Sequence, residues 1–320
     1  MHALNHRLRK IFAPQRADGP FWVIWILGLC PAVAIWSIFF TDHLSQVNWW
    51  IVAASYYFMA MGVSMGFHRY FSHSSFQTGR VFQFILGLAG TLSGQTGPLS
   101  WSLEHDIHHR NCETEVDPHS TNVSFLHAHI LWLWNGQARH SELEKSKWFK
   151  YPELVFLEAA APVIFYAFGV TIWVAFGTSA MVWYWLLPSA LSFHATMMIN
   201  SVGHGHGFFP YKDMYQPDAC RATNIPWGWP FILGDNWHCN HHAYPTAAFH
   251  GWKWWEIDPN RYVLTVLHWV GVVKRPLSPN QKILERNAAS RSTMPPQLSL
   301  AAPNFWKEQE EATVAPEAAE

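Results

Sequence analysis

Histidine is the residue whose number and spacing point most directly to chemistry in this sequence. Twenty histidines occur among 320 residues. Nine of them form four tight groups: His68 and His73 in HRYFSH; His105, His108 and His109 in HDIHH; His204 in NSVGHG; and His238, His241 and His242 in HCNHH. Because the main chemical uses of imidazole are proton transfer and metal binding, these four groups are the first candidates for a functional site.

The spacing within each group predicts where the rings point. Positions i, i+3 and i+4 of an α-helix lie within about 100° of one another, so each HxxHH triplet can present three imidazoles on one helix face. His68 and His73 differ by five positions, which is about 140° on an ideal α-helix. We therefore expect the helix to loosen after His68 if both rings serve one site.

Nine imidazoles are too many for one ion of four to six ligands, so two metal ions are implied. Imidazole suits zinc, iron, copper and nickel alike. A closed zinc site of four histidines would leave several ligands unused, and the paired Glu-x-x-His motifs of soluble di-iron carboxylate proteins do not occur here. A pair of irons at a membrane surface would suit O₂ activation beside a lipid chain.

Four apolar segments are long enough to cross a bilayer as helices and would position these groups. They span about 21–40, 49–67, 154–176 and 180–200, contain no Lys or Arg, and include one acid, Glu158. Basic residues before 20, in 68–153 and after 200 place both termini and the histidines on the cytoplasmic side. The expected fold is all-α and multi-pass, and the alternative is four buried helices of a soluble core.

The segment between the two hairpins, Val81–Leu103, is also apolar but is interrupted by five glycine and proline positions. We expect it to lie at the cytoplasmic interface rather than to span the bilayer. Residues 1–20 form a cytosolic N-terminal segment, 21–285 the membrane domain, and 286–320, rich in Ala, Pro, Glu and Ser, a disordered tail.

Composition excludes several other classes of protein. The net charge is −1 and only 13% of residues are charged, about half of the ~25% of soluble proteins, while 16% are aromatic. Such a chain is neither disordered nor a nucleic-acid binder.

Its four cysteines form no CxxC motif and are expected to be reduced thiols. Basic residues such as Arg69 are expected to face solvent or lipid.

The motifs together resemble the integral-membrane fatty acid desaturases, most closely those of the acyl-CoA Δ9 (stearoyl-CoA) type. The resemblance covers about residues 50–276 and includes HRYFSH, HDIHHRNCETEVDPHS, NSVGHG and GDNWHCNHHAYP in the family's order and spacing. It implies four transmembrane helices beneath a cytosolic helical cap. It also implies two iron ions (Fe²⁺/Fe³⁺) bound by the nine histidines, with Asn200 holding a metal-bound water and Asp235 orienting a ligand ring.

The implied reaction uses O₂ and two electrons to introduce a cis double bond into a long acyl chain held in a bent tunnel. Trp101 matches a family tunnel residue, while Tyr56, Tyr57 and Ala60 could close the tunnel or simply pack between helices. The implied partners are the lipid bilayer, a fatty acyl substrate and a separate electron donor, which would be a ferredoxin, a cytochrome b5-like protein or a reductase.

Two questions stay open at this point. Thr96, Gly97 and Leu103 stand where animal members carry polar contacts to coenzyme A, so a phospholipid or a carrier protein could also deliver the acyl chain. The alternative functions are a histidine-box lipid hydroxylase or oxygenase and, from another class, a metal-handling membrane protein. A transporter would be expected to place its ligands within the spans near the midplane, whereas only His194 lies there.

Overall fold

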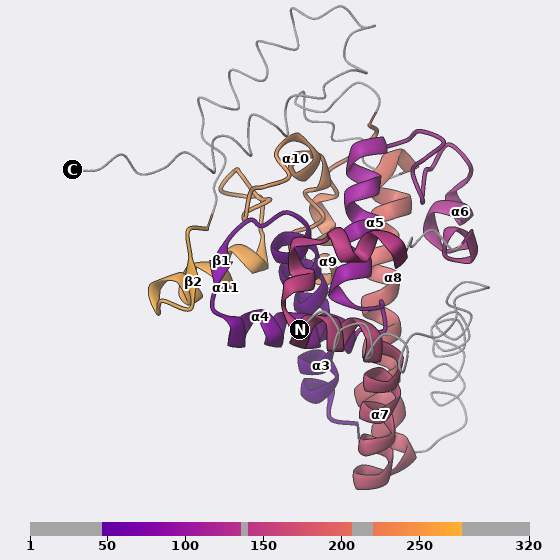
Figure 1. Ribbon diagram of the computed structural model, residues 1–320, viewed down its shortest axis with the longest axis vertical. Helices are drawn as coiled ribbons and strands as arrows, with labels where there is room; N and C mark the ends of the chain where they lie inside the picture. Colours follow the sequence, from indigo (N-terminus) through magenta and orange to yellow (C-terminus); the bar gives the residue numbers. More distant parts are fainter. Residues whose placement is uncertain (1–46, 136–139, 207–219, 277–320) are drawn as a thin grey trace, which may run out of the picture.

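The computed structural model describes residues 47–135, 140–206 and 220–276, and these residues form a mainly helical protein (Figure 1). The predicted span 21–40 and the segments 1–20 and 286–320 lie outside them. The elements used below are α3 (Trp49–Met61), the π-helix η2 (Gly62–Ser72), β1 (Gln77–Thr78), α4 (Arg80–Thr91), α5 (Pro98–Asn111), α6 (Phe125–His129), α7 (Pro152–Met181), the π-helix η6 (Val182–Leu186), α8 (Leu187–Ser201), the π-helix η7 (Val202–His206), α9 (Trp229–Ile232), α10 (His238–Ala243), α11 (Pro259–Trp269) and β2 (Val273–Lys274). Short 3-10 helices at Leu131–Asn135, His140–Lys145, Lys147–Lys150 and Pro226–Gly228 connect them.

Two helical segments of the described residues are long and apolar enough to cross a membrane, Trp49–Ser72 and Pro152–His204. The first contains the predicted span 49–67. The second contains both predicted spans 154–176 and 180–200 in one run of 53 residues. The described part of the chain therefore holds two candidate membrane segments, the second of which is interrupted, and the four-span topology stays a prediction.

The interruption of the second segment lies at Gly177, whose φ of 82° and ψ of 177° are not helical. A positive φ favours glycine, because a side chain would be strained there. Beyond it the chain packs back on itself: the rings of Phe165 and Trp185 are 4.8 Å apart, and a Cβ on Gly169 would lie 2.3 Å from Trp185. The two predicted spans are thus the two arms of a helical hairpin.

The apolar segment 81–103 forms two helices rather than one. α4 ends at Thr91 and α5 begins at Pro98, with Gly94 at a φ of +78° between them. In Figure 1, α4 runs across the direction of α3 and α7. It contacts the first span closely, since a Cβ on Gly62 would lie 2.3 Å from the backbone of Ala89. Its position at the membrane interface stays a prediction.

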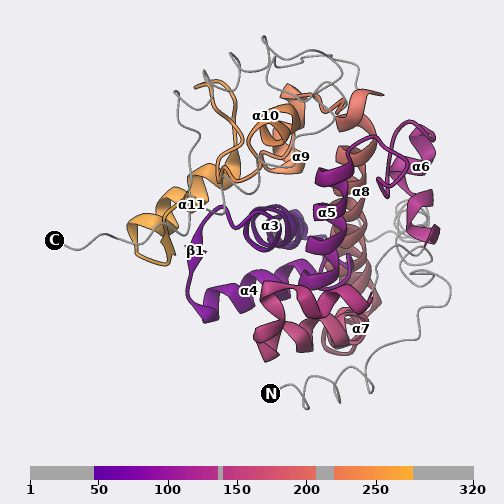
Figure 2. The same cartoon turned by 45° about the horizontal axis from the view of Figure 1, so that its top comes forward.

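The core surrounds the upper part of the first span. Figure 2 shows α3 almost end-on, with α4, α5, α10 and α11 around it. Phe67 and Phe71 of η2 belong to a buried cluster with Leu99 of α5, Leu154 of α7 and Leu264 of α11. The antiparallel pair β1–β2 joins the segment before α4 to the segment after α11.

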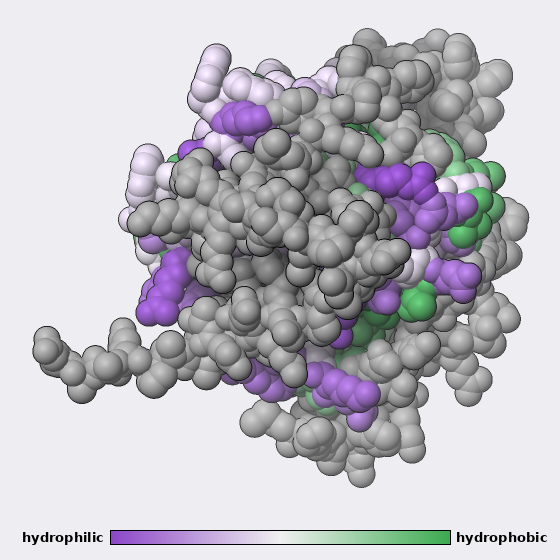
Figure 3. All heavy atoms as spheres, turned by 90° about the horizontal axis from the view of Figure 1, so that it is seen from above, coloured by the Kyte–Doolittle hydropathy of each residue, from purple (hydrophilic) through white to green (hydrophobic). Residues whose placement is uncertain are grey.

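The outer surface differs between the two ends of the molecule. Seen from above in Figure 3, the described residues mix strongly hydrophilic side chains with hydrophobic ones. Near the break in the second segment, by contrast, Val174 and Phe176 are each 76% exposed. Large exposed apolar side chains of this kind fit the membrane-facing surface expected for α7.

Candidate metal centre

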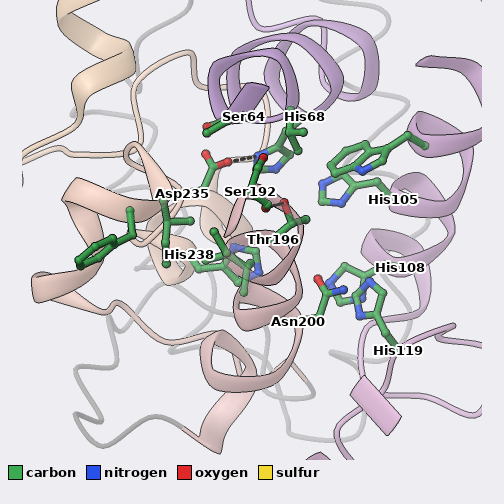
Figure 4. Close-up of a pocket in the computed structure, with 17 residues that line it drawn as sticks. Ser64, His68, His105, His108, His119, Ser192, Thr196, Asn200, Asp235 and His238 are labelled. Atoms are coloured by element: carbon green, nitrogen blue, oxygen red, sulfur yellow. Dashed lines mark hydrogen bonds and ion pairs between the residues drawn. The ribbon is translucent and has the colours of Figure 1, made fainter. Parts of the chain in front are cut away.

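The nine predicted histidines come together from four stretches of chain into two adjacent groups. We name them the five-histidine group (His68, His73, His105, His109 and His241) and the four-histidine group (His108, His204, His238 and His242). Within each group the candidate ligand atoms all lie within 4.8 Å of one another. Figure 4 shows members of both groups, among them His68, His105, His108 and His238, around one pocket.

A π-helix brings His68 and His73 into the same group. Residues 62–72 have π-helical hydrogen bonding, and the backbone N–H of His73 donates to the carbonyl of His68 at 3.2 Å. A π-helix closes its hydrogen bonds five residues apart, so positions i and i+5 share a face. The sequence predicted loosening after His68, whereas the wider winding already begins at Gly62.

The two HxxHH helices each divide their histidines between the two groups. α5 supplies His105 and His109 to the five-histidine group and His108 to the other. α10 supplies His238 and His242 to the four-histidine group and His241 to the first. In both helices the i, i+4 pair serves one group, which is the pair expected to lie closest on a helix face.

The distances between ring nitrogens fit shared metal ions. In the five-histidine group three Nε2–Nε2 distances, His68–His241, His73–His105 and His109–His241, are each 2.9 Å. In the four-histidine group they are 2.8 Å for His204–His238, 3.1 Å for His238–His242 and 3.4 Å for His108–His242. Two nitrogens about 2.0–2.1 Å from one ion, at angles of about 90–109°, would be separated by about 2.8–3.4 Å. The donor set therefore fits two ions.

Burial keeps seven of these imidazoles in the neutral form that binds metals. It lowers their pKa well below the ordinary value, and neighbouring imidazoles lower it further; the seven are His73, His105, His108, His109, His238, His241 and His242. These seven rings thus present uncharged nitrogens, because protonated rings so close together would repel one another.

Carboxylates lie behind three of the rings and orient them. Asp235 approaches Nδ1 of His68 at 3.1 Å, as expected for its position before the last motif. Asp117 approaches Nδ1 of His108 at 2.9 Å, and Glu113 approaches Nδ1 of His204 at 3.2 Å. Such contacts fix the tautomer, because Nδ1–H donates to the carboxylate and leaves Nε2 for the metal. Both acids follow the second motif, where several acids stand close together and no local pattern marks which of them contact a ring.

Two cysteines are paired rather than free. Cys112, at the C-terminal end of α5, forms a disulfide with Cys220, and their Cα atoms are 5.5 Å apart. The expectation of reduced thiols is therefore wrong for this pair. The sulfur of Cys220 lies 3.3 Å from Nδ1 of His242, so the disulfide borders the four-histidine group directly. The sequence feature that could have drawn attention to Cys112 is its position shortly after the second motif.

Two further buried histidines, which the sequence analysis left aside, lie beside the groups. The ring of His119 is 4.2 Å from that of His108, and burial lowers the pKa of His119 to about 4. The ring of His250 is 4.6 Å from that of His241. His119 could have been suspected from its place in Asp-Pro-His after the second motif, but nothing in the local sequence marks His250.

A pocket lies between α3, η2, α5, α8 and α9 and is bordered by both histidine groups (Figure 4). Of the predicted residues, Trp101, Ala60, Asn200 and Asp235 line it. Trp101 stacks on His105 with ring centroids 5.0 Å apart.

The two predicted tyrosines stand differently toward the pocket. Tyr56 packs with Ala60, and its hydroxyl donates to the carbonyl of Phe231, a residue that lines the pocket. Tyr57 does not line the pocket, and its side chain is exposed. Tyr56 thus contacts the wall of the pocket and Tyr57 does not, and a role for either residue in a substrate tunnel stays a prediction.

Comparison with known proteins identifies the class to which this site belongs. The sequence model of the fatty acid desaturase family matches residues 47–264, which contain all nine histidines, and the chain belongs to this family. It is an oxidoreductase of lipid metabolism with a histidine-rich metal-binding site and membrane helices.

Individual relatives share about a third or less of their residues with this chain. The chain is 33% identical to the sn-1 stearoyl-lipid 9-desaturase of Anabaena variabilis over 214 residues, 66% of this chain and 77% of the relative. It is 29% identical to Delta-9 acyl-lipid desaturase 1 of Arabidopsis thaliana over 72% of this chain and 75% of the relative. It is 28% identical to the acyl-CoA C20 Delta5-desaturase of Anemone leveillei over 79% of this chain and 80% of the relative.

Proposed function

We propose that this chain introduces a cis double bond into a long-chain fatty acyl substrate, using O₂ and two iron ions bound by the five-histidine and four-histidine groups. The reaction balances when two adjacent methylenes, O₂, two electrons and two protons become one double bond and two waters. The observation that carries the proposal is the spacing of 2.8–3.4 Å between ring nitrogens in both groups, directly beside an apolar pocket.

The residues of the chain would divide the work between holding metal and positioning substrate. Iron ions at the two groups would supply the oxidising power that an unactivated C–H bond requires. Asp235, Asp117 and Glu113 hold the Nδ1 proton of a ligand ring and so keep each Nε2 directed inward. Trp101 and Ala60 shape the pocket wall that would hold two carbons of the chain beside the metals.

The setting of the enzyme follows from its apolar helices. We propose a multi-pass protein of four spans with both termini and the histidine groups on the cytoplasmic side, as the distribution of Lys and Arg predicts. Asn200, which lines the pocket, would hold a metal-bound water. Electrons would come from a separate ferredoxin, cytochrome b5-like protein or reductase.

The acyl carrier and the bond position are finer parts of the same proposal. Resemblance to the acyl-CoA Δ9 type predicts an acyl-CoA substrate and a double bond at carbon 9. Two of the relatives above are named for 9-desaturation of acyl lipids and one for Δ5-desaturation of acyl-CoA. An acyl-lipid substrate is therefore the alternative carrier.

Lipid profiling of a host that expresses the chain tests the proposal. We expect a new monounsaturated fatty acid, located by double-bond analysis in gas chromatography–mass spectrometry after feeding of defined chain lengths. The His109→Ala variant should abolish it, while His268→Ala, on α11 and outside both groups, should not. A hydroxy fatty acid in place of the unsaturated one would favour a lipid hydroxylase, and unchanged lipids with normal iron binding would favour a metal-handling protein.

A further inference from the structure

Arg69 follows the first ligand histidine and has no exposed surface, contrary to the expectation that it faces solvent or lipid. Its Nη1 donates to both carboxylate oxygens of Asp258 at 3.2 Å and to the carbonyl of Ala248 at 2.9 Å. Its Nη2 donates to Oδ1 of Asp235 at 3.1 Å. A fully buried guanidinium bound to two carboxylates holds them in fixed positions, because its planar donors match both acceptors.

Asp235 divides its two oxygens between two histidines. Oδ2 lies 3.1 Å from Nδ1 of His68, a member of the five-histidine group. Oδ1 lies 3.1 Å from Nδ1 of His250, which belongs to neither group. With Arg69 also donating to Oδ1, the carboxylate accepts from both rings.

The tautomer of His250 follows from these contacts. Its Nδ1 lies between a carboxylate oxygen at 3.1 Å and Nη2 of Arg69 at 3.2 Å. Since Arg69 has other acceptors and the carboxylate is the stronger partner, Nδ1 of His250 carries the proton and donates to Asp235. Its Nε2 is then an acceptor, and this buried atom has no hydrogen-bond partner among the described residues.

A complementary unpaired donor lies beside it. His241 approaches two other rings of the five-histidine group through Nε2, so its proton belongs on Nδ1. That Nδ1 is also buried without a partner among the described residues, and the rings of His241 and His250 are 4.6 Å apart. A hydrogen bond between this buried donor and this buried acceptor, direct or through one water, would remove the free-energy cost of leaving both unpaired.

We propose that His250 is a positioning residue that orients His241, as Asp235 orients His68, so that one carboxylate aligns two ligands of the five-histidine group. Arg69 and Asp258 hold that carboxylate, and Asp258 also caps the first turn of α11. Gly234 permits the arrangement, since a Cβ there would lie 2.0 Å from Oδ1 of Asp258. The proposal rests on the proposed role of the nine histidines as iron ligands.

The test compares His250→Phe with His268→Phe in purified, iron-loaded protein. His268 is an exposed histidine whose Nδ1 donates to the carbonyl of Val273, and it belongs to neither group. We expect His250→Phe to weaken iron binding about 10–100-fold at one of the two ions, the range typical for loss of a partner behind a ligand ring. Bound iron at limiting supply should then fall from about two ions per chain toward one, while His268→Phe keeps two.

Mössbauer spectroscopy with ⁵⁷Fe separates positioning from general damage. His250→Phe should change the signal of one iron and leave the other as in the wild type. His250→Gln, whose amide oxygen can accept the proton of His241, should restore part of the iron content. Arg69→Lys keeps the positive charge but loses the planar guanidinium that binds both carboxylates, and it should perturb the same iron signal. Arg80→Lys, which alters an exposed pair with Glu153, should leave that signal unchanged.

Several results would overturn the assignment. They are wild-type iron content and spectra in His250→Phe, equal loss of both ions, or a wild type that binds no iron. Should His250→Phe fail to yield a monodisperse protein, His250→Gln and Arg69→Lys decide by the same two readouts. Iron content needs no turnover, so a wild type that binds two irons but forms no double bond would refute the desaturase proposal and leave this test standing.

Discussion

At the scale of single residues, Gly234 is a position behind the histidine groups where the packing leaves no room for a side chain. Its φ is +99°, in the region that favours glycine. A Cβ at this position would lie 2.0 Å from Oδ1 of Asp258 and 2.8 Å from Nη2 of Arg69. Any side chain would therefore push apart a buried ion pair as well as strain the backbone.

Gly234→Ala should for that reason destabilise the protein by about 3 kcal/mol or more, the scale of disrupting a buried ion pair. The expected result is a lower unfolding midpoint and reduced iron binding. Differential scanning fluorimetry in detergent and iron analysis measure the two effects. Gly79→Ala is the matched control, because nothing lies within 4 Å of a Cβ there. Equal behaviour of the two variants would contradict the role given to Gly234.

Residue spacing predicted which histidines gather but not what lies behind them. The HxxHH triplets and His204 could be singled out because their periodicity is local and their number exceeds structural need. Arg69 was expected on the surface, since a basic residue at the end of a span usually faces water or head groups. Its actual partner, Asp258, is 189 positions away, and no local pattern reports such a contact.

At the scale of elements, the N-terminal turn of α5 is anchored by Glu158, the one acidic residue in the predicted spans. Glu158 of α7 accepts from the backbone N–H groups of Leu99 and Ser100 at 2.9 and 3.0 Å, in the first turn of α5. The carboxylate satisfies donors that have no partner within the helix and lies at the positive end of the helix dipole. Glu158 therefore sets the start of the helix that presents His105, His108 and His109.

Glu158→Ala should weaken this anchor. By analogy with the loss of a helix cap, we expect a cost of about 1–2 kcal/mol in stability and partial loss of iron from both groups, because α5 supplies ligands to each. Thermal unfolding and iron analysis are the measurements. Glu153→Ala on the same helix, which removes an exposed pair with Arg80, should stay near the wild type. An iron deficit confined to one group would argue against this anchoring role.

Glycine and proline mark two element boundaries, of which the sequence predicted one. The hairpin of the second segment turns at Gly177, between the two predicted spans, whereas the break at 92–97 was not predicted, although Gly94, Gly97 and Pro98 lie at it. The π-helix at Gly62–Ser72 was beyond prediction. Its winding depends on tertiary contacts, such as Gly66 beneath the backbone of Leu86, which the spacing of His68 and His73 only hints at.

At the scale of the whole molecule, the centre gathers buried histidines whose pKa values burial lowers, to about 4 for His119 and His250. In the unfolded chain a histidine takes up its proton near pH 6.5. The unfolded state therefore binds more protons than the folded state as the pH falls below about 6.5. The stabilisation is fully present above that pH and is lost progressively toward about pH 4.

Metal-free protein should accordingly lose thermal stability on acidification. We expect the unfolding midpoint of chelator-treated protein to be constant between pH 8 and 7 and to fall steadily from about pH 6.5 to pH 5. Scanning calorimetry or fluorimetry in one detergent across this range is the measurement. Added iron should raise the midpoint most at the higher pH values, because protons compete for the same nitrogens. A midpoint that rises on acidification would contradict the neutral state of the rings.

The bond between Cys112 and Cys220, which are 108 positions apart, closes the stretch between them into a covalent ring. α6, α7 and α8 all lie inside this ring, together with His204. After a backbone cut anywhere between the two cysteines, the disulfide still joins the two fragments. The fragment that contains α5 therefore stays covalently linked to the fragment that contains α10. Fragments of such a nicked protein would separate only after reductant opens the ring.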